Sequence, residues 1–274
     1  MLFKDTKDST QPIISLLTDF GLVDPFVAEM KGVILSICPH ARIIDVSHSV
    51  DKYDVRLGAF LLAEATPSFP RGTIHVAVVD PGVGSSRRAI VIETKRGAYV
   101  GPDNGLLIPA AEHDRVVKTF EITNRSFMRR QVYSTFHGRD IFASTAAHLA
   151  NGRRLADCGP LIQDSVGSPF QQATIQGKHA ECEVMHVDSF GNIITNLTRV
   201  QLCQLNFREG SKASVHVGRR TLSGTVVKTY AELQRGRLGM LIDSHEFVEI
   251  AYRESSAARK LGIRKGNVVR VSGC

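Results

Sequence analysis

Three short stretches of this chain combine titratable side chains with glycine. Their sequences are TDFG at 18–21, DPGVG at 80–84 and FHGRD at 136–140. The first two directly follow apolar runs that are expected to form buried strands. Ligands of open α/β sheets bind at the carboxyl ends of parallel strands. The sequence therefore places Asp19 and Asp80 where a ligand could bind.

The loop that begins at Asp80 allows more than one interpretation. A glycine-rich loop after a strand suggests a phosphate loop, but the Gly-Lys-Ser/Thr ending is missing, so that match is weak. Alternatively, the glycines let backbone approach a ligand while Arg87, seven positions on, pairs with Asp80 and keeps it ionised. An ordinary surface ion pair fits this loop equally well, and an isolated Asp19 also fits a turn or a cap.

His137 lies just before a predicted helix, whose dipole favours the neutral imidazole. The chain has no HxH or HExxH spacing, so no zinc site is predicted. A single histidine in such a position is more often structural than catalytic.

The second half carries a different group of polar residues. Residues 188–192 are Asp-Ser-Phe-Gly-Asn, and Asp243-Ser244-His245 precedes a strand that contains Glu249. The small residues at 255–258 open a helix. An aromatic ring beside Ser, Asn and backbone groups suits a purine base, but each stretch taken alone is typical of a turn or a helix cap.

Strands and helices alternate in the first part of the chain. Strands are expected at 13–17, 41–46, 73–79, 88–94 and 97–100, and helices at 26–37, 54–65, 106–112 and 140–151. Asp24 and Pro25 are expected to be the cap and first residue of the first helix. This order predicts an α/β layered domain over residues 12–160.

The residue composition and the pattern of apolar residues change after that domain. Residues 161–177 are rich in Gly and Pro and are predicted to be a linker. Short strands follow at 181–187, 193–197, 213–217, 221–229, 239–242, 247–251 and 268–271, with one short helix at 256–261. Residues 178–274 are therefore expected to form a small β-barrel or sandwich.

Composition limits the function further. No run of eighteen apolar residues exists, and the polar residues 1–11 resemble a frayed tail, not a signal peptide. Five widely spaced cysteines without a CxxC pair predict free thiols and a cytoplasmic protein.

The net charge is +7, and residues 178–274 hold 15 basic and 9 acidic side chains. Nucleic-acid binding by the second domain stays open, but scattered basic residues and few aromatics favour a solvated basic face.

Taken together, the stretches resemble one family. TDFG, ICPHARIIDVSH, VVDPGVG, GPDNGLL, FHGRD, DSFGN and a late DS…EIA…SAA segment follow one another in the order seen in S-adenosyl-L-methionine (SAM) hydroxide adenosyltransferases. These enzymes are relatives of the SAM-dependent fluorinases and chlorinases. The resemblance extends from about Ile13 to Val271.

The resemblance implies an N-terminal α/β/α domain, a C-terminal β-barrel and a homotrimer with each active site at a subunit interface. The implied reaction converts SAM and water to adenosine and L-methionine by attack at the ribose 5′ carbon. Asp80, Arg87 and His137 match the triad that activates the water. No metal or cofactor is implied, because a sulfonium expels a neutral thioether.

The resemblance also implies which residues bind the substrate. Asp19, with Phe20 beside it, matches the ribose site. The adenine positions are Phe190, Asn192 and Ala257, and the methionine positions are Asp188, Ser244, Glu249 and Tyr252. Two features depart from relatives: no fluorinase-like insertion is evident, and Asp243-Ser244 stands where Asn-Ser is usual.

Two further functions remain alternatives. A non-catalytic SAM- or adenosine-binding protein would have the same fold without turnover. A SAM-dependent halogenase would use halide in place of water.

Overall fold

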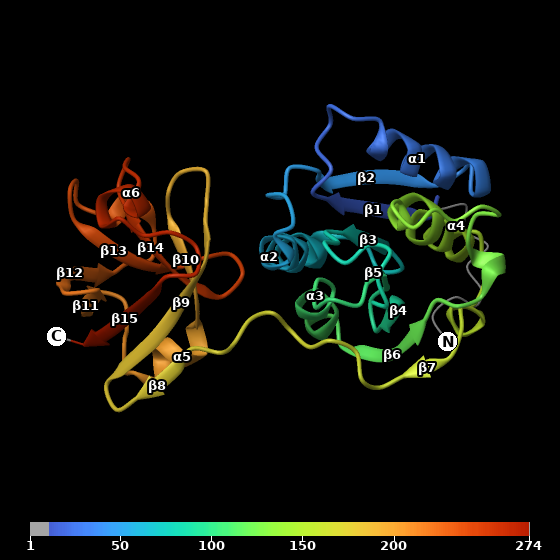
Figure 1. Cartoon of the computed structure of the whole chain (residues 1–274). Helices are drawn as coiled ribbons and strands as arrows, with labels where there is room; N and C mark the ends of the chain where they lie inside the picture. The colour runs from blue at the N-terminus through green and yellow to red at the C-terminus, as the bar shows by residue number, and fades with distance from the viewer. Residues whose placement is uncertain (1–10, 274) are drawn as a thin grey trace. The chain divides into compact units, whose positions relative to one another are not determined.

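The computed structural model describes residues 11–273, and the expected tail and Cys274 lie almost wholly outside this range. The chain divides into two compact units between Pro169 and Phe170 (Figure 1). The boundary falls within the segment 161–177 that was predicted to be a linker. Short strands at each end of that segment pair with the unit they adjoin.

The N-terminal unit is built on a mixed seven-stranded sheet. Its strands are β1 (Ile13–Thr18), β2 (Arg42–Ser47), β3 (Ile74–Val78), β4 (Ala89–Thr94), β5 (Ala98–Pro102), β6 (Val116–Glu121) and β7 (Leu161–Ile162). Their order is β2-β1-β3-β5-β4-β6-β7. The neighbours β2, β1, β3 and β5 are parallel to one another. The strands β4, β6 and β7 join the sheet by antiparallel pairing. The predicted α/β layered domain is confirmed.

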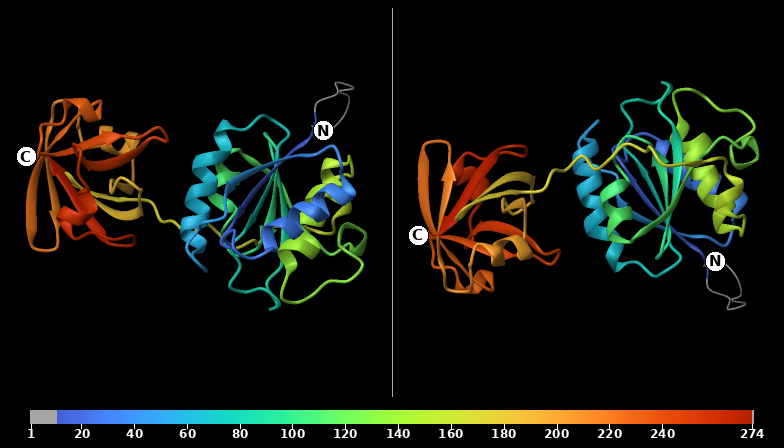
Figure 2. Two further views of the ribbon diagram at one scale, coloured as in Figure 1. Left: turned by 90° about the horizontal axis from the view of Figure 1, so that it is seen from above. Right: turned by 90° about the horizontal axis from the view of Figure 1, so that it is seen from below.

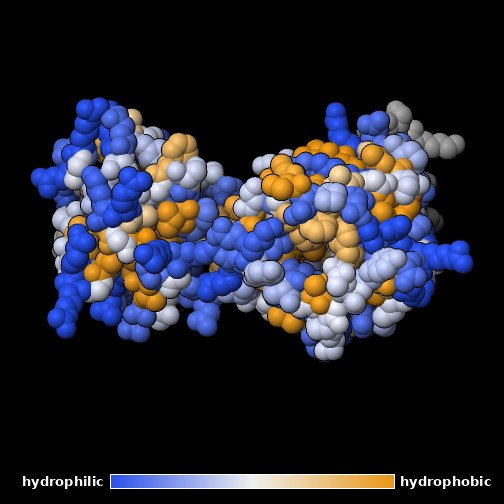
Figure 3. All heavy atoms as spheres, turned by 45° about the horizontal axis from the view of Figure 1, so that its top comes forward, coloured by the Kyte–Doolittle hydropathy of each residue, from blue (hydrophilic) through white to orange (hydrophobic). Residues whose placement is uncertain are grey.

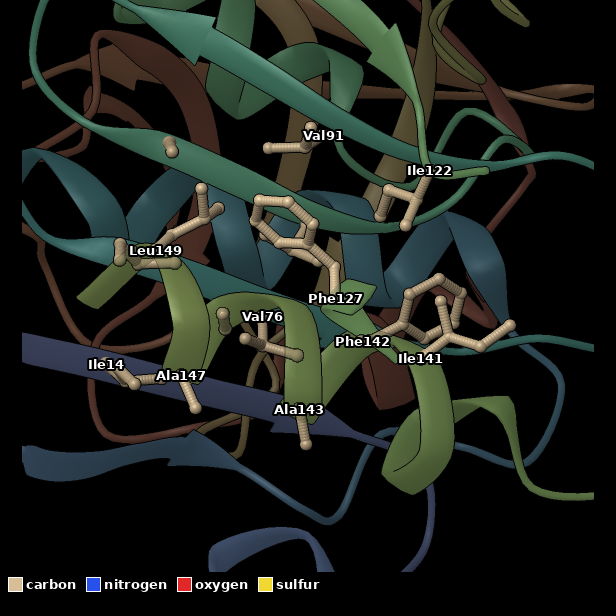
Figure 4. Close-up of a cluster of buried hydrophobic side chains, with 14 of the residues drawn as sticks. Ile14, Val76, Val91, Ile122, Phe127, Ile141, Phe142, Ala143, Ala147 and Leu149 are labelled. Carbon is tan, nitrogen blue, oxygen red and sulfur yellow. The ribbon is translucent and has the colours of Figure 1, made fainter. Parts of the chain in front are cut away.

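Helices cover both faces of this sheet (Figure 2). α1 (Phe26–Ile37) and α4 (Ser144–Ala150) pack together on one face, and α2 (Val55–Ala65) and α3 (Ile108–His113) on the other. The main core joins the first pair to the strands, and Figure 4 shows Phe127 and Phe142 among its side chains. Because both faces are covered, every residue of β3 is buried.

Two neighbouring strands, β1 and β3, also contribute a buried polar pair to the core. The Ser15 hydroxyl lies 2.7 Å from Nδ1 of His75, whose ring stacks on Tyr99 at 4.9 Å. Burial, and then the charge of Arg96, lower the pKa of His75 to about 3. The neutral imidazole is therefore part of the folded core.

The cap predicted for the first helix and the start predicted for the last helix of this unit are wrong, although α1 spans the predicted residues 26–37. Pro25, not Asp24, occupies the cap position of α1, and no side chain caps that helix. The helix expected from residue 140 begins earlier, with a π-helical segment at Gly138–Ala143 that leads into α4. Asp140 does not cap the helix, because its carboxylate binds arginines and a loop N–H.

The C-terminal unit is a seven-stranded barrel. Its strands are β9 (His179–Val187), β10 (Ile193–Thr198), β11 (Lys212–Val217), β12 (Arg220–Val226), β13 (Leu238–Ile242), β14 (Phe247–Tyr252) and β15 (Val268–Gly273), with β8 (Thr174–Gln176) added beside β9. Pairing of β9 with β10 closes the barrel. The predicted barrel is confirmed, and the sandwich alternative is excluded.

Two short helices accompany the barrel. α6 (Ala257–Leu261) begins after the cap residue Ser256, as expected. α5 (Arg199–Gln204) was missed, although Thr198 and Gln201 form a capping box that the sequence displays.

The described cysteines are unpaired thiols: Cys38, Cys158 and Cys182 are buried, and Cys203 is exposed. Over residues 11–273, the helices are all too short or too polar to cross a membrane.

Candidate active site

The structure brings Asp80, Arg87 and His137 together. Asp80 follows β3, Arg87 precedes β4, and His137 precedes the π-helical segment. Arg87 Nε lies 3.0 Å from each carboxylate oxygen of Asp80, and Nη2 lies 2.5 Å from Oδ2. The same Nη2 lies 2.8 Å from His137 Nδ1. One guanidinium therefore links the carboxylate to the imidazole.

These contacts determine the tautomer of His137. A guanidinium can only donate, so Nδ1 of His137 accepts from Arg87 and the neutral ring carries its proton on Nε2. Burial and the charge of Arg87 lower the pKa of His137 from its ordinary value of 6.5, outweighing the opposing effect of Asp80 and Asp140. At neutral pH the triad thus offers a proton acceptor on Asp80 and a donor at Nε2 of His137.

Glycines allow the three signature loops to touch. Gly84 has a φ of +78°, and a Cβ there would lie 2.6 Å from the carbonyl oxygen of Ser134, in the loop before His137. A Cβ on Gly138 would lie 3.3 Å from the ring of Phe20. Phe20 and Phe136 also meet edge to face at 5.9 Å. The TDFG, DPGVG and FHGRD stretches therefore form one packed group.

Asp140 anchors the loop that carries His137. It is fully buried and accepts from Arg139 Nε at 2.7 Å, from Arg129 Nη1 at 3.2 Å and from the N–H of Tyr133 at 2.9 Å. The Arg139 guanidinium lies 4.8 Å from the centre of the Phe136 ring. The last two residues of FHGRD thus support the first two, a role that sequence reasoning missed.

Asp19 lies at the end of β1 with 5% of its surface exposed. Its Oδ2 accepts from the N–H of Tyr53 at 2.9 Å, and its carbonyl oxygen accepts from Lys52 Nζ. Its other oxygen, Oδ1, has no hydrogen-bond partner within residues 11–273. One carboxylate oxygen is therefore committed to the loop, and the other can accept from a ligand.

His48, the last residue of the ICPHARIIDVSH stretch, fixes the same turn, a role that the sequence analysis did not assign to it. Its Nδ1 lies 2.9 Å from Thr18 Oγ1, its Nε2 lies 3.1 Å from Asp45 Oδ1, and its carbonyl accepts from the N–H of Gly21. The thirty-residue separation between Thr18 and His48 hides this contact from local sequence patterns.

In the barrel unit, Asp188 organises the turn between β9 and β10. Its Oδ1 accepts from the N–H groups of Phe190 and Asn192, and its Oδ2 accepts from Asn192 Nδ2. A Cβ on Gly191 would lie 2.1 Å from Ser256 Oγ, so the turn packs against the start of α6, where Ala257 is buried. The ring of Phe190 is 78% exposed. The structure therefore places the predicted residues Asp188, Phe190 and Asn192 on one turn, which packs against the helix start that carries Ala257.

Glu249 is 4% exposed and accepts a 2.7 Å hydrogen bond from the Tyr230 hydroxyl. Burial raises the pKa of Glu249; the bond from Tyr230 opposes this, and the nearby charges of Asp188 and Asp243 add to it. Sequence reasoning missed Tyr230, because nothing local marks it as a partner of a strand nineteen residues away.

The two remaining predicted residues differ in their positions. Ser244 is adjacent to Asp243, and its hydroxyl lies 3.2 Å from His245 Nδ1. Tyr252 is three positions after Glu249 on β14, so the two side chains point to opposite faces. Tyr252 packs in the barrel core, with Lys260 Nζ 4.5 Å from its ring centre. The structure does not bring Tyr252 together with Glu249.

Both halves of the chain match sequence models of one protein family. Residues 14–159 match the SAM hydroxide adenosyltransferase N-terminal domain, and residues 182–270 match the C-terminal domain. The chain belongs to this family. It is 42% identical to an "(R)-S-adenosyl-L-methionine hydrolase" of Salinispora tropica, covering 95% of this chain and 98% of the relative. A protein of the same name from Thermus thermophilus is 35% identical, covering 94% and 98%.

Family members named for halide chemistry are more distant. The "Fluorinase" of Actinoplanes sp. is 27% identical, covering 95% of this chain and 97% of the relative. That alignment spans 292 positions against the 274 residues of this chain, so it contains gaps opposite fluorinase residues.

Solved structures share the fold over nearly the whole chain. A crystal structure of a conserved protein from Thermotoga maritima has a TM-score of 0.90 at 36% identity, covering 94% of this chain and 99% of that one. A conserved protein from Thermus thermophilus has a TM-score of 0.76, also at 36% identity, covering 96% and 100%.

Proposed function

We propose that this protein hydrolyses (R)-S-adenosyl-L-methionine to adenosine and L-methionine. The observation that carries the proposal is the assembled group of Asp80, Arg87 and His137 at the carboxyl end of β3. It occurs in a chain 34–42% identical to four proteins named "(R)-S-adenosyl-L-methionine hydrolase".

In the proposed reaction, a water oxygen forms a bond to the ribose 5′ carbon as the bond from that carbon to sulfur breaks. The bonding pair goes to the sulfonium, which leaves as the neutral thioether of methionine. The leaving group needs no acid, so neither a metal nor a redox cofactor is required. The difficult part is the nucleophile, because water must lose a proton.

The geometry suggests separate duties for the triad. Asp80 accepts the proton from the water, and the Nε2–H of His137 holds the water oxygen. Arg87 fixes both side chains through one guanidinium. A positioned base contributes about 10²–10⁴-fold, and holding the nucleophile in line with the leaving sulfur contributes about 7–11 kcal/mol.

The substrate contacts follow the predicted assignments. Asp19 would accept from the ribose hydroxyls through Oδ1. Phe190 and Asn192 would contact adenine. The methionine ammonium and the sulfonium are both cations, and Asp188, Asp243 and Glu249 form an acidic group suited to one of them.

We also propose that the protein is a cytoplasmic homotrimer whose active sites lie at subunit interfaces, as the family resemblance implies. Apolar side chains are exposed on the N-terminal unit (Figure 3), among them Leu22 and Val23 at 73% and 99%. An apolar surface of this kind would be covered if it lay at a subunit interface. Light scattering on purified protein would report three chains of 30.0 kDa.

The reaction is tested by mass spectrometry after incubation with each sulfonium epimer in ¹⁸O-labelled water, with and without chloride. We expect ¹⁸O in the adenosine 5′ hydroxyl, unlabelled methionine, and faster turnover of the R epimer. A chlorinated nucleoside would instead identify a halogenase. Tight binding of SAM without any product would identify a binding protein, and copurifying nucleic acid without SAM binding would favour the basic barrel as a nucleic-acid module.

The pH dependence of kcat/KM should follow the protonation of the His137 imidazole. The active triad needs a neutral ring, because a proton on Nδ1 would break its bond from Arg87. Since the pKa of His137 is lowered, the neutral form persists below pH 6.5. We therefore expect kcat/KM to stay level as the pH falls to 6.5 and to decline only below it. Circular dichroism at each pH separates this loss from unfolding, and a decline that begins above pH 6.5 would contradict the prediction.

A further inference from the structure

A separate cleft lies in the N-terminal unit, between α1, α4 and the loop at residues 128–133. Its volume is about 720 Å³. None of Asp19, Asp80, Arg87 or His137 lines it. The polar side chains that do are Ser36, Arg129, Arg130, Gln131, Tyr133, Ser144 and His148.

The lining of the cleft is positively charged. It includes two arginines and no carboxylate. Arg129 Nη1 donates to Asp140 Oδ1 at 3.2 Å. The other N–H groups of this guanidinium remain available to a ligand. Arg130 is exposed, and its guanidinium makes no ion pair or hydrogen bond within residues 11–273. An arginine fork pairs with two oxygens of one anion, so this lining favours a polyoxygen anion.

Ser144 provides an independent sign that a partner is missing. It is fully buried on α4 and lines the cleft, yet its hydroxyl has no hydrogen-bond partner within the described residues. A helical serine usually bonds a carbonyl of the preceding turn, and a buried hydroxyl without any partner is unfavourable. An acceptor that entered the cleft would satisfy this hydroxyl.

We propose that this cleft binds a small phosphate-bearing molecule. Arg129 and Arg130 would hold the phosphate oxygens, and the Ser144 hydroxyl would donate to one of them. The volume exceeds that of inorganic phosphate and lies in the usual range for small-molecule sites, so a nucleoside monophosphate also fits.

The test is calorimetric titration of the full chain in phosphate-free buffer with inorganic phosphate and with AMP, each in the presence of saturating adenosine, which fills the proposed active site. Binding of inorganic phosphate shows that the anion alone suffices. Binding of AMP but not of phosphate under these conditions shows that the ligand is a nucleotide. Because the readout is binding and not turnover, a failure here is distinct from a failure of the proposed hydrolysis.

Two variants locate the site. Arg130→Gln should weaken phosphate or AMP binding about tenfold or more, because a charged hydrogen bond is lost. Ser144→Ala should also weaken binding without lowering the thermal midpoint of the free protein, since the hydroxyl there has no partner to lose. The matched control is Arg71→Gln, an exposed arginine of the same unit whose only described bond is 3.5 Å to the Lys95 carbonyl.

Three results would overturn the proposal. They are no binding of either phosphate compound at millimolar concentration, unchanged binding by both cleft variants, or an equal loss in Arg71→Gln, which would indicate attraction by overall charge.

Discussion

Asp80→Asn will lower kcat by about 10²–10⁴-fold, the range that a positioned base contributes. Asparagine keeps the size of the side chain and one oxygen for Arg87, so the loop should hold its shape. It removes the basicity that accepts the water proton. Single-turnover rates with saturating SAM measure the loss, and calorimetric SAM affinity should change much less.

Substitutions of His137 distinguish the two duties within the triad. Nε2 of His137 is a donor in this structure, because Nδ1 accepts from Arg87. His137→Gln can still present an N–H near that position, so it should retain more activity than His137→Ala. If His137 were the base instead, Gln and Ala would be equally inactive and Asp80→Asn would keep substantial turnover. Thermal midpoints of all three variants control for unfolding.

The sequence predicts the part of this triad that is local. Asp80 and Arg87 are seven residues apart on one glycine-rich loop, so their pairing could be proposed from spacing alone. His137 is fifty residues from Arg87, and only the family resemblance connected them. The structure supplies the physical link, a single guanidinium nitrogen that contacts both.

The same distinction applies to the fold. β3 and α1 were predicted closely because their apolar patterns match the burial of their residues. β6 was missed because its first three residues are exposed and its pattern is weak. The π-helical segment could not be predicted, since it depends on Asp140 binding Arg129 and Tyr133 from an earlier loop.

Supporting residues were the hardest to find. His48 and Tyr230 each contact a predicted site residue or its neighbour across nineteen residues or more. The residues around them in the sequence do not indicate these contacts, because a histidine or tyrosine with a buried hydrogen bond cannot be told from one without it by sequence alone. Contacts between distant segments decide such roles, and only the folded chain displays them.

Asp19→Ala is expected to weaken SAM binding by at least about tenfold. Hydrogen bonds to a charged group contribute about 1.5–3 kcal/mol each, and a factor of ten corresponds to about 1.4 kcal/mol. Oδ2 of Asp19 already binds the Tyr53 N–H, so Oδ1 is the oxygen that would accept from the ribose. Calorimetry with an inactive Asp80→Asn background measures affinity without turnover.

Two controls separate ribose recognition from loop support. Asp19→Asn keeps an oxygen for the Tyr53 N–H and should fall between wild type and Asp19→Ala. Asp24→Asn removes an exposed charge from the same loop and should bind as wild type does.

The decisive comparison uses adenosine and 2′,3′-dideoxyadenosine. If Asp19 holds the ribose hydroxyls, wild type prefers adenosine and Asp19→Ala loses that preference, because the ligand groups that the carboxylate would bind are absent from the second compound. A preference for adenosine that survives in Asp19→Ala would assign the ribose to other residues and leave Asp19 as the support of the loop at residues 52–53.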